Sequence, residues 1–170
     1  MNVWSEYNKV VNAIIPVADA FTTGTGIKSD VVNLENYNKC TFIVATGATS
    51  VNNELVTVVA GVSAASCTTA ITFKYRTQVA AEPPAVGSDV PSALTAVTVA
   101  ATGFNFTVST VGGVYIVEVD AAVVAAAGTD FDHVAINFAD GGTDAAQTAC
   151  VVAILSEPRY PQAILATAID

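Results

Sequence analysis

The chain has little charge and few residues of the kinds that carry out catalysis. Of its 170 residues, 52% are hydrophobic and only 12% are charged, and it has one histidine, one tryptophan and three cysteines. The charged fraction is about half the usual one. No apolar run is long enough to cross a membrane. A surface with so little charge interacts weakly with water, so we expect another chain to cover part of it.

The charge that is present is unevenly distributed. Residues 1–76 hold five acids and five bases, whereas residues 77–170 hold ten acids and one base, Arg159, which gives the net charge of −9. An acidic surface repels phosphate, which argues against direct binding of nucleic acid. Glu6, Pro16 and Asp19 make the first residues a poor signal peptide. We therefore expect the protein to be made and kept in a reducing cytoplasm.

The cysteines and the histidine form no recognisable catalytic motif. The three cysteines match no zinc-ligand spacing and cannot all pair with one another. Cys40 and Cys150 fall in apolar runs, where a free thiol acts as a small hydrophobic group. Nucleophilic catalysis would have to use His133, in contact with Asp130 or Asp132. No nucleophile motif accompanies it, so the favoured interpretation is a solvated histidine on the polar face of a strand.

Two pairs of aspartates flank one predicted strand. They are Asp130 with Asp132 and Asp140 with Asp144. Clustered loop carboxylates can hold Ca²⁺ through their oxygens, but this spacing does not match an EF-hand, so we interpret them as solvated turn residues. Glycoside hydrolysis would need paired carboxylates in an aromatic-lined cleft, and Trp4 is the only tryptophan. The sequence therefore predicts no catalytic, cofactor-binding or metal-binding residue.

The clearest structural signal is a strand–helix–strand unit over residues 114–139. Alternation predicts strands at 114–120 and 134–139, with Val134 and Phe138 on one face and His133 on the other. Asp120 is predicted to cap a helix over 121–127. Gly128 is expected to end that helix in the left-handed conformation.

Short alternating runs continue through most of the chain. We expect strands at 30–34, 40–46, 54–60, 71–76, 95–100, 104–109, 114–120, 134–139 and 149–155. The runs 40–46 and 149–155 are apolar on both faces, as strands in the middle of a sheet would be. This pattern predicts an all-β fold, a β-sandwich or jelly roll of about eight to nine strands with one short helix. Its domain would span residues 29–155, between an N-terminal arm (1–28) and a C-terminal tail (156–170).

The two ends have a different character. Residues 2–15 fit an amphipathic helix with Trp4, Tyr7 and Val11 on one face; the alternative is an extended arm whose aromatic residues pack on the body. In the tail, Ile164 and Leu165 have no obvious apolar partner. The tail would lie either along a neighbouring subunit or over its own sheet.

Four segments carry a resemblance to a known group of proteins. They are SDVVNLENYNKCTFIVATG (29–47), ITFKYRTQV (71–79), GVYIVEVDAAVVAAAG (113–128) and VVAILSEPRYPQAIL (151–165). Together they resemble small structural proteins of tailed bacteriophages, in which a D-V-V-N-x-x-N-Y element (here 30–37) precedes a strand and the chain ends in L-S-E-P-R-Y-P (here 155–161). The resemblance covers most of the chain after residue 28.

The resemblance implies a component of the virion. The expected function is that of a capsid decoration (cement) protein, which binds the outside of the shell and has the major capsid protein as its partner. Such proteins are β-rich, often homotrimeric and without catalytic residues. The expected interaction residues lie in the arm and the tail: Trp4, Tyr7, Val11, Arg159, Tyr160, Ile164 and Leu165. A second hypothesis is a carbohydrate- or receptor-binding sandwich on a phage tail or fibre, with Tyr75, Tyr115 and Tyr160 as candidate aromatic platform; an enzyme is the third.

Overall fold

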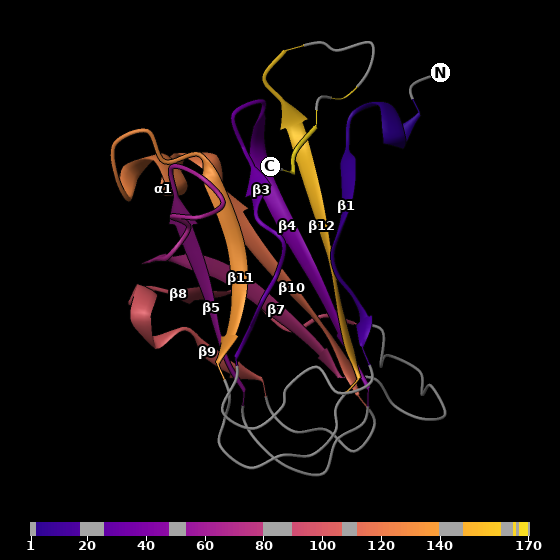
Figure 1. Ribbon diagram of the computed structural model, residues 1–170. Helices are drawn as coiled ribbons and strands as arrows, with labels where there is room; N and C mark the ends of the chain where they lie inside the picture. The colour runs from indigo at the N-terminus through magenta and orange to yellow at the C-terminus, as the bar shows by residue number, and fades with distance from the viewer. Residues whose placement is uncertain are drawn as a thin grey trace.

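The computed structural model describes residues 3–17, 26–47, 54–79, 90–106, 112–139, 148–160, 165 and 167–169. They form the predicted all-β sandwich, with two antiparallel sheets and one short α-helix (Figure 1). The strands are β1 (Lys9–Val17), β2 (Ile27–Lys28), β3 (Val32–Asn33), β4 (Tyr37–Thr46), β5 (Glu54–Gly61), β6 (Thr69–Ile71), β7 (Phe73–Val79), β8 (Thr95–Val97), β9 (Phe104–Phe106), β10 (Gly113–Asp120), β11 (His133–Ala139) and β12 (Ala149–Pro158). The helical elements are η1 (Trp4–Glu6), η2 (Ala100–Thr102) and α1 (Ala121–Ala126). In the described part of the chain, none of them is long and apolar enough to cross a membrane.

The first sheet, which we call sheet A, has the strand order β1-β12-β4-β10-β7-β8. The two runs predicted to be apolar on both faces lie side by side in it as β4 and β12, with Phe42 opposite Ala153. Each of these strands pairs with a neighbour on both sides. Their apolar composition fits this position, because an interior strand has little contact with water. The prediction that both runs are interior strands is confirmed.

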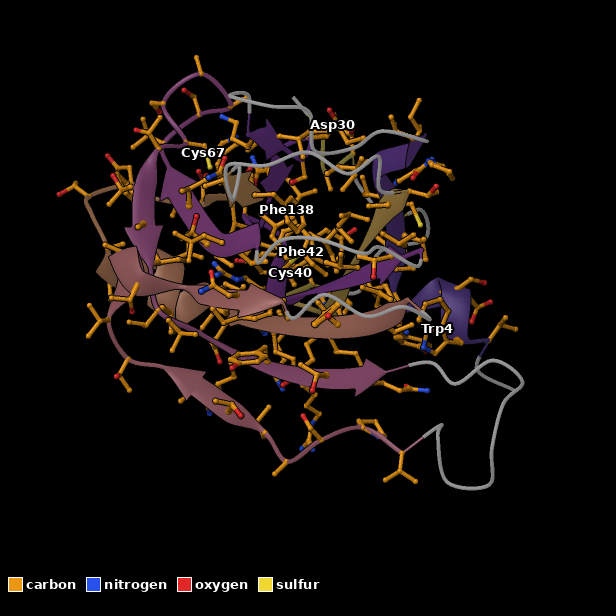
Figure 2. All side chains as sticks on the ribbon, turned by 90° about the horizontal axis from the view of Figure 1, so that it is seen from below. Trp4, Asp30, Cys40, Phe42, Cys67 and Phe138 are labelled. Atoms are coloured by element: carbon orange, nitrogen blue, oxygen red, sulfur yellow. The ribbon has the colours of Figure 1, made fainter. Side chains whose placement is uncertain are left out.

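The second sheet, sheet B, has the order β2-β11-β5-β6, with β3 also beside β11 and β9 also beside β5. Val134, Ile136 and Phe138 of β11 are fully buried, as their alternation predicted. They form one core with Phe42, Val117 and the other inward-facing side chains of sheet A. Figure 2 shows Phe42 and Phe138 inside the molecule, between the two sheets.

The predicted helix over residues 2–15 is wrong. Residues 9–17 form β1, which is the edge strand of sheet A and pairs with β12. The β-branched residues of this segment favour an extended backbone, and the edge of β12 provides partners for the backbone hydrogen bonds. Only η1 is helical, and it is a single turn. The strand count exceeds nine because β1 and β2 lie in the expected arm and the run 71–76 is divided at Thr72 between β6 and β7.

Helix α1 begins as predicted but ends differently. The Asp120 carboxylate accepts a hydrogen bond of 2.8 Å from the backbone N–H of Ala122, which caps the helix. Gly128 does not adopt a positive φ, so the predicted left-handed ending is wrong; Asp130 has that conformation instead, with φ of 59°. Glycine is required at 128 for space, because a Cβ there would lie 2.6 Å from the ring of Phe131.

The tail returns to its own sandwich over the residues that are described. The N–H of Asn33 donates a 2.9 Å hydrogen bond to the carbonyl of Ala168, and Val32 forms a bridge with Ile169. Ala168 is buried, and Leu165 packs against the main core. Of the two paths left open by the sequence, these residues therefore follow the one over their own body.

Candidate interaction surface

His133 is buried, so the prediction of a solvated histidine is wrong. Its Nδ1 hydrogen-bonds to Oδ1 of Asp132, and its Nε2 lies 3.5 Å from Nδ2 of Asn33. Of the two carboxylates considered, Asp132 makes the contact, while Asp130 is exposed. The burial has a cause outside β11. Residues 62–68 lie over the outer face of sheet B, where Cys67 and Ala135 belong to a second apolar cluster.

The buried thiols are poor nucleophiles. Burial raises the pKa of Cys67 to about 11, and its Sγ lies 3.2 Å from the carbonyl oxygen of Val59, to which it donates a hydrogen bond. Burial also raises the pKa of Cys40, which lies in the main core. Nucleophilic attack requires the thiolate, so a raised pKa makes both thiols weak nucleophiles. The geometry favours a structural role for Cys40, Cys67 and His133. Within the described ranges, no group of three or more His, Cys, Asp or Glu side chains is arranged to hold a metal ion.

The aromatic residues proposed as a sugar platform are mostly directed inward. Tyr75 stacks on Phe104 with ring centroids 4.0 Å apart and planes 8° apart, and Tyr115 lies 6.0 Å from the same ring. Phe73 completes this cluster between the sheets. Tyr160 is the exposed member of the proposed set. Aspartates 140 and 144 of the second carboxylate pair lie outside the described residues.

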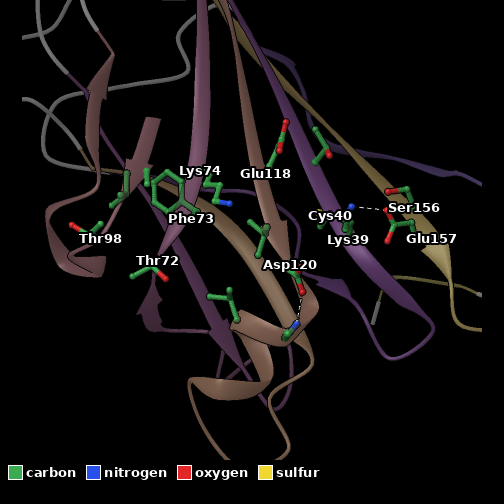
Figure 3. Close-up of a pocket in the computed structure, with 16 residues that line it drawn as sticks. Lys39, Cys40, Thr72, Phe73, Lys74, Thr98, Glu118, Asp120, Ser156 and Glu157 are labelled. Atoms are coloured by element: carbon green, nitrogen blue, oxygen red, sulfur yellow. Dashed lines mark hydrogen bonds and ion pairs between the residues drawn. The ribbon is translucent and has the colours of Figure 1, made fainter. Parts of the chain in front are cut away.

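A groove of about 970 Å³ lies beside α1, at one end of sheet A (Figure 3). Phe73 and Val97 contribute buried apolar surface, and the charged side chains are Lys39, Lys74, Glu118, Asp120 and Glu157. Nζ of Lys39 pairs with Oε1 of Glu157 at 2.5 Å, and this hydrogen bond raises the pKa of Lys39. The groove therefore offers charges of both signs in close proximity, which suits a polar contact better than a small apolar ligand.

The structure separates the predicted interaction residues into three groups. Trp4, Tyr7 and Tyr160 have exposed side chains, with 56%, 47% and 65% of their surface accessible. Arg159 is also exposed; its Nε donates to Oδ1 of Asn38 at 3.2 Å.

Two other members of the predicted set face their own core. Val11 is 3% exposed and belongs to the core, so its predicted contact with a partner is wrong. Its position follows from the strand, since β1 turns Val11 inward. Leu165 packs against the same core, and residue 164 lies outside the described part of the chain.

Two exposed apolar residues of β1 are absent from the predicted set. Val10 and Ile15 are 52% and 63% exposed. With Val3, Trp4 and Tyr7 they make five large exposed apolar side chains within residues 3–17, and we call these five residues the β1 patch. Alternation along 10–12, with Val11 inward and both neighbours outward, was the available signal for it.

Partly exposed apolar residues continue from the β1 patch across sheet A. Val10 is paired in register with Ile154, and Val152, Ile43 and Ile116 follow one another in register on β12, β4 and β10. Each of these side chains alternates with a buried one, so they lie on the side of the sheet that faces away from the core. Ile43, Ile116, Val152 and Ile154 form what we call the outer face of sheet A.

Comparisons of the chain with profiles of known protein families, with curated proteins and with solved structures found no match.

Proposed function

We propose that this chain is a non-enzymatic virion protein that binds the outside of a phage capsid shell and stabilises it. The major capsid protein would be its partner. The proposal combines the sequence resemblance over residues 29–47, 71–79, 113–128 and 151–165 with a surface suited to contact another protein. It would place the protein on the capsid, after synthesis in the host cytoplasm.

The observation that carries the proposal is the β1 patch. Large exposed apolar groups gathered within a short segment are costly to hydrate and are typical of interaction sites. Residues 3–17 contain one acid, Glu6, and one base, Lys9, although the whole chain has a net charge of −9. The acidic part of the protein can therefore remain in solvent while a neutral, apolar part contacts the shell.

The surroundings of the patch extend this surface. The outer face of sheet A adds four branched aliphatic side chains, and the row formed by Val152, Ile43 and Ile116 ends at Arg76 of β7. Burying a large aliphatic or aromatic side chain fully contributes about 1.5–3 kcal/mol. A few such contacts offset the loss of translational and rotational freedom on binding.

A sugar- or receptor-binding module is the weaker candidate. Two of its three candidate aromatic residues, Tyr75 and Tyr115, pack in the cluster between the sheets and are not available to stack on a sugar. A homotrimer is implied by the resemblance alone, whereas association of some kind is also favoured by the low charge of the surface.

The test is to locate the protein in the virion. Capsids would be prepared from the encoding phage with the gene for this protein deleted. Their surface would be reconstructed by electron cryomicroscopy before and after incubation with the purified protein. We expect new density on the outer surface and shells that resist higher temperature. Density confined to the tail, or binding to a glycan array without binding to shells, would refute the decoration role.

A further inference from the structure

The edges of the two sheets are very unequal in length. On sheet B the edge strands β2, β3, β6 and β9 have only two or three residues each, and β8 at one edge of sheet A has three. Very short edge strands prevent unwanted pairing with other chains. The remaining edge strand, β1, has nine residues and, in the described part of the chain, pairs only with β12 (Figure 1).

The C-terminal half of β1 is protected from pairing, but its N-terminal half is not. The register with β12 is irregular between Asn12 and Ile14, and the carbonyl of Ala13 already accepts a 2.9 Å hydrogen bond from the N–H of Asp30. Pro16 has no N–H to donate. Residues 9–12 keep a regular register with β12 and carry none of these features. They form the open part of the edge.

The side chains around the open part are complementary to a second copy of themselves. Antiparallel pairing about a two-fold axis brings the N-terminal part of each strand beside the C-terminal part of the other. An axis at Val11 places Val10 of each copy opposite Asn12 of the other, within the regular part of the strand. The Val10 side chains then lie on either side of the axis, and each is 52% exposed in the single chain.

The charge distribution also permits association of identical chains at this edge. A protein with a net charge of −9 repels its own copies over most of its surface. Residues 3–17 hold one acid and one base, so the β1 patch is neutral. The edge therefore combines open backbone groups, exposed apolar side chains and no excess of like charge.

We infer that the open part of β1 pairs antiparallel with the open part of a second copy about an axis at Val11, with Val10 of each chain opposite Asn12 of the other, so that sheet A continues across two subunits. The pairing is two-fold and yields a dimer or an assembly with an even number of subunits. It does not depend on the proposed capsid role, because it involves the purified chain alone.

The test compares two variants that add the same charge at equally exposed positions. Val10→Lys/Ile15→Lys places two positive charges on the edge, whereas Val90→Lys/Val99→Lys places two on exposed valines outside β1. Charged side chains block edge pairing. We expect sedimentation to give a dimer for the wild type and the control, and a dissociation constant raised about tenfold or more for the edge variant.

Hydrogen–deuterium exchange of the wild type provides a second measurement that does not depend on the variants folding. Amides in residues 9–12 should gain protection as the protein concentration rises through the dimerisation range, because pairing engages backbone N–H groups. A monomer at all concentrations, a trimer, equal dissociation constants for the two variants, or concentration-dependent protection elsewhere but not in 9–12 would each overturn the inference.

Discussion

The outer faces of the two sheets differ in how far they are covered by the rest of the chain. On sheet B, residues 62–68 fold over the face and bury Ala135 and Cys67 completely. On sheet A, the side chains of Ile43, Ile116, Val152 and Ile154 stay partly exposed and belong to neither apolar cluster. A single chain has thus completed a second small core on one face and left the other in contact with water. The difference indicates where a partner is needed.

The largest expected difference in the free energy of unfolding comes from placing a charge on each of the two outer faces. Ala135→Lys puts an ammonium group under residues 62–68, where no room or partner exists for it, and should cost about 5 kcal/mol or prevent folding. Ile116→Lys puts the same group on the outer face of sheet A, where it reaches water and should cost less than about 1 kcal/mol. Urea unfolding of both variants measures the contrast, and equal losses would show that the face of sheet A is also closed.

The next contrast uses adjacent residues of β4. Phe42 is fully buried between the sheets and Ile43 is on the outer face. Phe42→Ala should lower the free energy of unfolding by about 3–5 kcal/mol through lost burial and the cavity left behind. Ile43→Ala should lower it by no more than about 1 kcal/mol, since part of its surface is already hydrated. A similar loss for the two would contradict the assignment of faces.

Residues 62–68, which cover the outer face of sheet B, should also make the stability of the protein depend on pH. The pKa of Cys67 is about 11 in the folded protein against a reference value of 9.0, so the folded state favours the neutral thiol. Stability from this group is fully present below pH 9.0 and falls as the pH rises toward 11. Across that interval the loss is at most about 2 kcal/mol. Thermal unfolding at each pH should show that Cys67→Ala loses less stability over the same interval than the wild type. If the stability of the two proteins fell equally with pH, the thiol would not be buried in the folded state.

The smallest effect on stability is expected in the β1 patch. Trp4→Ala/Tyr7→Ala removes exposed side chains and should change the free energy of unfolding by less than about 0.5 kcal/mol. If the proposed function is correct, the same variant should bind capsid shells about tenfold more weakly, since aromatic residues contribute strongly at interfaces. Leu94→Ala/Val99→Ala, which removes exposed apolar groups elsewhere, is the matched control and should bind normally.

Much of the sandwich could be predicted because its signal is local. Alternation along β11 placed Val134 and Phe138 on the inward face correctly, and the Asp120 cap followed from its place before an alanine-rich run. β1 was mistaken for a helix because Trp4, Tyr7 and Val11 also fit a spacing of three to four residues. Side-chain periodicity alone could not reveal that β12, far away in the sequence, supplies the pairing edge.

The environment of the candidate residues was harder to predict. His133 stands on the face of β11 opposite Val134, and alternation alone suggested solvent there. Its burial depends on residues 62–68, which are distant in sequence and cover that face. Gly128 illustrates a second limit, because its need for space arises from the ring of Phe131 and not from its own backbone angles.

The strand order of sheet A has a consequence for folding during synthesis. β12 lies between β1 and β4, so a strand made late joins two strands made early. Until residues 149–158 leave the ribosome, β1 has no strand to pair with and β4 has one open edge. Contacts between such distant segments form slowly and leave apolar strands exposed in the meantime. Sheet A can therefore be completed only after β12 has left the ribosome, and until then the nascent chain passes through a stage that is vulnerable to aggregation.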